Sequence, residues 1–143
     1  MVAAFRELSA CFTAGVFGAL INAVFVWGAG AAGLSALIGV NIAPAWTPAW
    51  LYQRLVWGGI WGFFFLLPVW NGSVYLRGLV FGLAPSAVQL LVVFPNMLDK
   101  GMFGLALGDM TPVYVLIANS FWGIGAAWWE SMNHDRLRFK ARL

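Results

Sequence analysis

The chain has 143 residues, of which 62% are apolar and 9% are charged, and its mean hydropathy is +0.84. This composition excludes an ordinary soluble domain and is typical of a membrane protein with several spanning segments. The net charge is +3, but half of the eight basic residues fall in the last eight positions, namely Arg136, Arg138, Lys140 and Arg142. That placement fits the cytoplasmic excess of basic residues in membrane proteins, so no nucleic-acid partner is predicted.

The first apolar segment covers residues 9–27, after a short polar start that contains Arg6 and Glu7. It is long enough for a membrane helix, and small residues recur three and four apart along one face. Its single cysteine, Cys11, excludes an intrachain disulfide and any site built from several cysteines.

Residues 28–40 are apolar and rich in glycine but too short to span a membrane. They extend the first helix, lie at the interface, or enter and leave on the same side. Residues 41–50 contain two prolines, which break helices, and two tryptophans, which favour the membrane interface. A loop is predicted there.

A second membrane helix is predicted over residues 51–70, which contain one charged residue, Arg54. Twenty residues span about 30 Å at about 1.5 Å per residue, the thickness of the hydrocarbon core of a bilayer. A patch of small residues in this segment favours close packing by another helix.

A tight turn at residues 71–73 precedes a third predicted helix over residues 74–94, with a kink at Pro85. The loop over residues 95–112 contains Asp99, Lys100 and Asp109. A fourth helix is predicted over residues 113–132, followed by a basic tail at 134–143. Four helices place both termini on one side, and the tail assigns that side to the cytoplasm.

Short sequence matches predict an internal repeat. Val16-Phe17-Gly18 recurs at residues 80–82 and Thr47-Pro48 recurs at 111–112, both displaced by 64, and Trp57-Gly58 recurs at 122–123. These matches indicate two copies of a helical hairpin, at about 9–70 and 74–133, within a single membrane domain over 1–143. The alternative is that such matches arise freely among common apolar residues.

The predicted fold is an all-α integral membrane protein, a four-helix transmembrane bundle of two hairpins in the bacterial inner membrane. Close packing between its helices is assigned to eight glycines: Gly15, Gly18, Gly58, Gly59, Gly62, Gly78, Gly82 and Gly123.

Arg54 is the leading candidate for a functional residue, because a charge inside a membrane helix is costly. It either extends to the lipid headgroups or turns inward, paired with Asp99 or Asp109, to attract an anion or close a gate. Four polar residues lie at membrane depth and either bond between helices or line a path for a small solute. They are Asn22, Ser86, Gln89 and Asn119.

Other candidates have simpler interpretations. Glu130 and His134 are one turn apart and Asp135 follows, but these groups are too few for a metal site, so a solvated helix end is favoured. Trp57, Trp61 and Trp122 lie beside glycines and either pack between helices or form a groove for a quinone or pigment. No phosphate loop, HExxH motif or catalytic constellation is present, so no enzyme, metal or cofactor is predicted.

The stretch RGLVFGLAPSAVQLLVVFP (residues 77–95), a loop with Thr-Pro and NSFWGIGAAWWESMNHDRLRFK (residues 119–140) resemble the closing part of YagU-like bacterial inner-membrane proteins. The resemblance covers under half of the chain, which lacks the larger loops associated with that family. It implies a bacterial inner-membrane protein linked to envelope or acid stress.

The sequence leaves two functions, of which the first is the main prediction and the second is the alternative. One is a homo-oligomeric channel or transporter-like protein for a small solute, whose path would be lined by polar residues around a shared wet space. The other is an accessory subunit of a larger membrane complex, with lipid, quinone or pigment as candidate ligands. An accessory subunit should bury its polar residues in pairs and offer an apolar face to its partner.

Overall fold

The computed structural model describes the backbone of residues 1–140 and the side chains of residues 1–133, and all its regular elements are helical, as predicted. The main helices are α1 (Val2–Ala31), α3 (Pro48–Trp61), α4 (Val74–Val88) and α5 (Thr111–Lys140). The shorter elements are α2 (Leu34–Leu37), η1 (Gly62–Leu66), η2 (Gln89–Met97) and η3 (Met102–Leu107). The basic tail predicted at 134–143 lies outside the described side chains.

The segment between the first two long helices begins as an extension of the first, which is one of the expected arrangements. Residues 28–31 extend α1, and Gly33 then turns the chain with a φ of 75°. The short α2 follows, and the backbone N–H of Asn41 donates to the carbonyl of Leu107 at 2.7 Å. This bond ties the loop after α2 to the segment before α5.

The second predicted helix begins earlier and ends earlier than expected. Thr47 caps α3 by accepting the Trp50 N–H at 3.2 Å, and Pro48 occupies the first helical position, where its missing N–H costs nothing. After Trp61 the helix tightens into the 3₁₀-helix η1, so the prediction of helix up to residue 70 is wrong beyond Leu66. Together α3 and η1 span about 31 Å.

The third predicted helix passes through Pro85 and changes its hydrogen-bond pattern at Gln89. Ser73 caps α4, and from Gln89 the helix continues as the π-helix η2, which ends three residues later than expected. After η2 the chain passes through Asp99 and Phe103, both with positive φ. Helix α5 then begins at Thr111, two residues before the predicted start.

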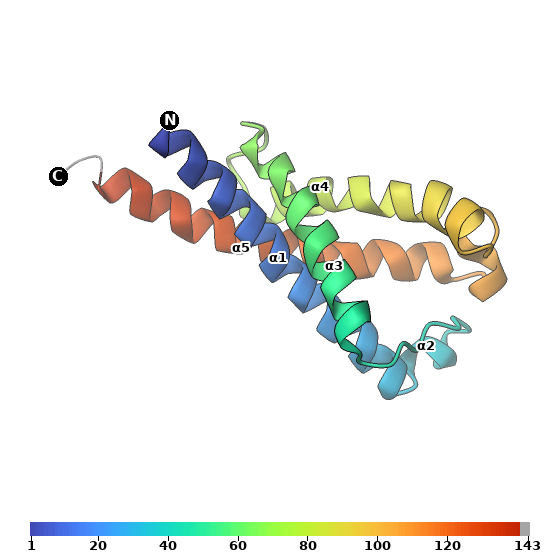
Figure 1. Cartoon of the computed structure of the whole chain (residues 1–143). Helices are drawn as coiled ribbons and strands as arrows, with labels where there is room; N and C mark the ends of the chain where they lie inside the picture. Colours follow the sequence, from blue (N-terminus) through green and yellow to red (C-terminus); the bar gives the residue numbers. More distant parts are fainter. Residues whose placement is uncertain (141–143) are drawn as a thin grey trace.

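The four long helices pack in the order α3, α1, α5, α4, with α1 and α5 in the middle (Figure 1). Both ends of the chain lie at one end of the molecule, and the η2–η3 segment lies at the other. At the end with the termini, Phe65 of η1 packs edge-on against Phe81 of α4, with ring centroids 5.0 Å apart. This contact brings the end of the first hairpin against the second.

All eight glycines assigned to packing lie where two helices meet. A Cβ atom on any of them would come within 3.0 Å of an atom of another element. Gly15 faces Gly58 and Gly62 across α1 and α3, while Gly78 faces Gly123 across α4 and α5. Each hairpin is therefore closed by glycines that bring the two backbones into contact.

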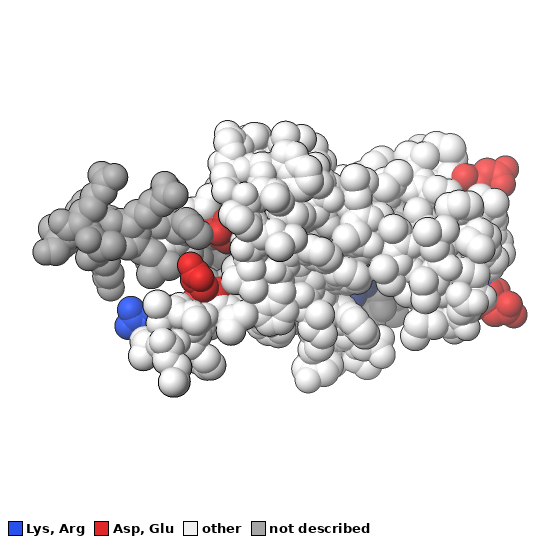
Figure 2. All heavy atoms as spheres, turned by 90° about the horizontal axis from the view of Figure 1, so that it is seen from above, with Lys and Arg blue, Asp and Glu red and all other residues white. Residues whose placement is uncertain are grey.

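Two helices are long and apolar enough to cross a membrane, Val2–Ala31 and Val74–Met97. Only 44% and 39% of their most apolar windows are buried in the molecule, so apolar side chains cover much of the surface. Figure 2 shows charged side chains at the two ends of the molecule and almost none on the surface between them.

Candidate functional site

A chain of hydrogen-bonded side chains crosses the middle of the molecule. It begins at Arg54 on α3, passes through Asn22 on α1 and Asn119 on α5, and ends at Ser86 and Gln89 at the junction of α4 and η2. We call these five residues the polar relay. It connects all four long helices at one level.

Arg54 forms the half-buried end of the polar relay. Its Nη1 donates to Oδ1 of Asn22 at 2.7 Å, and its Cζ lies 4.5 Å from the ring centroid of Trp50. The ring of Trp50 is 5.8 Å from that of Trp46, which meets Trp27 edge-on at 5.5 Å. A tryptophan cluster of Trp27, Trp46 and Trp50 therefore extends from Arg54 toward the α2 end of the molecule.

Asn22 is buried and uses both ends of its amide. Its Oδ1 accepts from Arg54, and its Nδ2 donates to the carbonyl of Ala118 at 2.7 Å and to Oδ1 of Asn119 at 3.5 Å. A buried amide costs little when its groups are paired. Asn22 thus joins α1 to α3 and to α5.

Asn119 continues the polar relay into the second hairpin. Its Nδ2 donates to Oγ of Ser86 at 3.1 Å and to Oε1 of Gln89 at 3.4 Å, and Ser86 in turn donates to the carbonyl of Gly82 at 2.8 Å. Gln89 is the residue at which α4 changes to the π-helix η2. Such π segments often occur at functional sites.

Asp109 is not part of the polar relay. It lies exposed in the turn before α5, and Asp99 is exposed after η2. Among the described side chains, the only ion pair joins Arg77 to Glu130, so the inward alternative, in which Arg54 pairs with Asp99 or Asp109, is not formed.

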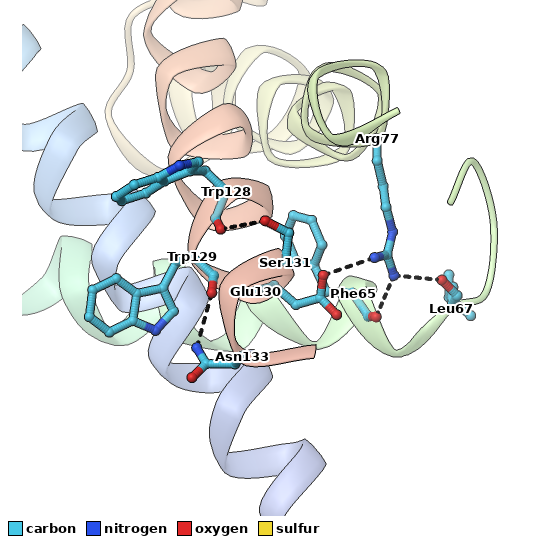
Figure 3. Close-up of polar contacts among 8 residues, drawn as sticks. All are labelled: Phe65, Leu67, Arg77, Trp128, Trp129, Glu130, Ser131 and Asn133. Atoms are coloured by element: carbon cyan, nitrogen blue, oxygen red, sulfur yellow. Dashed lines mark hydrogen bonds and ion pairs between the residues drawn. The ribbon is translucent and has the colours of Figure 1, made fainter. Parts of the chain in front are cut away.

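A second polar cluster, at the end with the chain termini, was not predicted as a site. Nη1 of Arg77 forms an ion pair with Oε2 of Glu130 at 3.0 Å, and Nη2 donates to the carbonyls of Phe65 at 2.6 Å and Leu67 at 3.0 Å (Figure 3). Both charged side chains are nearly buried, at 11% and 7% exposure. The sequence contained a signal for this ion pair, because the positive Arg77 lies near the start of one apolar helix and the negative Glu130 lies near the end of the next.

Two hollows lie beside this second cluster. A cavity of about 60 Å³ is lined by Glu7, Cys11, Phe65 and Glu130, among others, and a shallower hollow of about 320 Å³ includes Arg6 and Trp129. No residue of the polar relay lines either hollow. Within the part of the chain whose side chains are described, no group of three metal-binding residues occurs. His134 and Asp135 lie outside that part.

The three tryptophans expected beside glycines do not share one environment. Trp122 is buried between α1 and α3, where its Nε1 donates to the carbonyl of Gly15 at 3.1 Å. Trp61 stacks on Phe64, with centroids 5.7 Å apart, and Trp57 is 60% exposed. Trp122 therefore fills the space beside the glycines itself.

Comparison of the chain with protein-family models, with curated proteins and with solved structures finds no match.

Proposed function

We propose that the chain is a multi-pass protein of the bacterial inner membrane with four crossing segments, formed by α1, α3 with η1, α4 with η2, and α5. Support comes from lengths of about 30 Å or more, from exposed apolar side chains along the helices, and from charged side chains that, on the face shown in Figure 2, lie almost entirely at the two ends. The basic tail assigns the end with both termini to the cytoplasm. The resemblance to YagU-like proteins agrees with this location.

The two hairpins are copies of one unit in this proposal, because they share one arrangement of contacts. In the first, Asn22 bonds to Arg54, and Gly15 meets Gly58. In the second, Ser86 bonds to Asn119, and Gly78 meets Gly123. The polar residues are offset by 64 and 65, and in each second helix the contacting glycine follows four residues later.

The function that the geometry supports best is that of a non-enzymatic accessory subunit in a larger membrane complex. The observation that carries this proposal is the polar relay, whose side chains bond directly to one another instead of facing a shared wet space. Interhelical bonds of this kind fix helix positions. The exposed apolar faces of α1, α3 and α4 are then available to a partner membrane protein.

A homo-oligomeric channel or transporter-like protein is the second candidate. The observation in its favour is Arg54, a half-buried residue whose charge is not neutralised by any described carboxylate. In this arrangement the path lies between copies of the chain. Arg54 would then stand near its outer mouth.

Native mass spectrometry of the protein, purified in a mild detergent from its own membrane, tests the two candidates. A complex of one copy with a different membrane protein would support the accessory role. A defined homo-oligomer without another protein would contradict it and favour the channel. Flux assays on the wild type and on Arg54→Ala would follow in that case.

A further inference from the structure

Two different contacts hold the guanidinium of Arg54 in one orientation. Asn22 accepts one N–H, and the ring of Trp50, one turn earlier in α3, stacks on the group. A guanidinium has five N–H donors in a rigid planar fork. No nitrogen of Arg54 is both buried and without a partner, so the donors that Asn22 does not accept are not completely enclosed by the protein. The side chain is preorganised for a ligand.

None of the described side chains neutralises this positive charge. Asp99 and Asp109 are the described carboxylates closest to the proposed outer end of the molecule. Both are exposed, and neither forms an ion pair with Arg54. A charge at membrane depth is costly, and an adjacent anion offsets part of that cost.

The second hairpin shows that packing does not require this charge. There, the neutral Asn119 makes the corresponding bond to Ser86 and holds α5 against α4. The bond from Arg54 to Asn22 does the same for α3 and α1. The charge of Arg54 is therefore additional to the interhelical bond, and it remains available to a ligand.

The tryptophan cluster extends from the guanidinium toward the expected level of the lipid headgroups. Trp27 and Trp46 are exposed by 40% and 42%, and indole rings favour the membrane interface. Arg54 follows Pro48 by six residues, which places its Cα about 9 Å along α3. A lipid phosphate at the interface is within reach of the long arginine side chain.

From this geometry we propose that Arg54, with the tryptophan cluster, binds the phosphate of an anionic phospholipid. The planar fork matches the oxygens of a phosphate, and the exposed apolar side chains beside it suit acyl chains. A zwitterionic lipid carries its own cation and leaves the net charge of the site unchanged, so an anionic lipid is favoured. This inference rests on the membrane location proposed above.

The test uses native mass spectrometry of the full chain in neutral detergent, with phosphatidylglycerol or phosphatidylcholine added. We expect the wild type to bind one phosphatidylglycerol about tenfold more tightly than phosphatidylcholine. Arg54→Gln retains a donor toward Asn22 but should lose this preference. Arg54→Lys, which has the charge without the fork, should be intermediate. Arg6→Gln removes an exposed cation at the other end of the molecule and should behave as the wild type.

Three outcomes would overturn the proposal. Arg54→Gln retaining the preference would exclude Arg54 as the site. Inorganic phosphate that stabilises the wild type but not Arg54→Gln, without any lipid preference, would assign the site to a free anion. A partner protein that dissociates only from the Arg54→Gln variant would assign it to a protein carboxylate.

Further measurements distinguish an unfolded variant and a wrong membrane location from the absence of a lipid-binding site. Thermal melts of every variant show which ones are folded. If Arg54→Gln is not folded, the lipid site is tested with the wild type and Arg54→Lys alone. Phosphatidylglycerol should then stabilise the wild type more than phosphatidylcholine does, and this difference should be smaller in Arg54→Lys. Release of the wild type from membranes by sodium carbonate would contradict the membrane location. Retention there without any lipid preference would contradict only the lipid site.

Discussion

Asn22 is the residue at which three helices meet, because its amide contacts Arg54 on α3 and the Ala118–Asn119 region of α5. The carbonyl oxygen of its side chain is the protein acceptor for the only charged member of the polar relay. Losing it would leave a guanidinium without an acceptor at membrane depth, which costs more than losing one bond between neutral groups.

We therefore expect Asn22→Ala to lower the free energy of unfolding by about 1–3 kcal/mol. Ser86→Ala is the matched control in the other hairpin, and it should cost about 0.6 kcal/mol because only neutral groups lose a partner. Unfolding by sodium dodecyl sulfate, followed by circular dichroism, measures both. Equal losses in the two variants would contradict a special role for Asn22.

The positions of the relay residues could be predicted from the sequence, but not their contacts. Asn22, Ser86, Gln89 and Asn119 stand out because polar residues are rare in apolar helices. Whether they bond directly or face a wet space depends on the rotation of each helix, which the glycine contacts set. The alternative pairing of Arg54 with Asp109 is not formed, because it required a loop conformation that no local pattern specifies.

At the scale of elements, the close crossing of α1 and α3 depends on Gly15. A Cβ there would meet the carbonyl of Gly58 and the backbone of Gly62, neither of which can move independently of its helix. Gly28, in the same helix, has open space around its Cβ position. The two glycines differ only in what their substitution would contact.

Gly15→Ala should separate α1 from α3 and destabilise the protein by about 1–3 kcal/mol, as overpacking does. Gly28→Ala should be neutral or stabilising by up to about 1 kcal/mol, because alanine favours helix over glycine. Thermal melting of both variants in the same detergent tests the pair. A large loss for Gly28→Ala would contradict the assigned packing.

The ends of the long helices were harder to predict than their centres. Apolar length locates a helix but does not reveal that α3 tightens into η1 or that α4 widens into η2 at Gln89. In η1 the carbonyl of Phe65 accepts from Arg77, twelve residues further along the chain, which is a contact that a local pattern does not reveal. Charge placement alone could have indicated the pair of Arg77 with Glu130, but not its burial.

Glu130→Gln should be strongly destabilising, because it leaves the nearly buried Arg77 without its carboxylate. Breaking a buried ion pair from one side costs about 3–5 kcal/mol. Glu7→Gln is the control, since Glu7 is exposed at the same end of the molecule, and it should change stability by less than about 0.5 kcal/mol. Detergent-induced unfolding of the two variants gives the comparison, and a small loss for Glu130→Gln would show that the pair contributes little.

At the scale of the whole molecule, the charge distribution orients the proposed membrane protein. The turn between η1 and α4, which contains Asn71, lies at the same end of the molecule as the start of α1, and the start of α5, just after Asp109, lies at the opposite end (Figure 1). Arg6, near the start of α1, and Arg77, near the start of α4, lie at the same end as this turn, and basic residues favour the cytoplasmic side. Lys100, at the other end, opposes this bias, so the orientation needs a direct measurement.

Single-cysteine variants measure that orientation. In a Cys11→Ala background, Asp109→Cys should react with a membrane-impermeant maleimide in cells with a permeable outer membrane and an intact inner one. Asn71→Cys should react only after the inner membrane is broken, because its turn is expected in the cytoplasm. The reverse pattern would invert the topology and place Arg54 nearer the cytoplasmic leaflet. Labelling of both sites only after lysis would contradict a membrane-spanning arrangement, since the two ends of the molecule would then lie on one side.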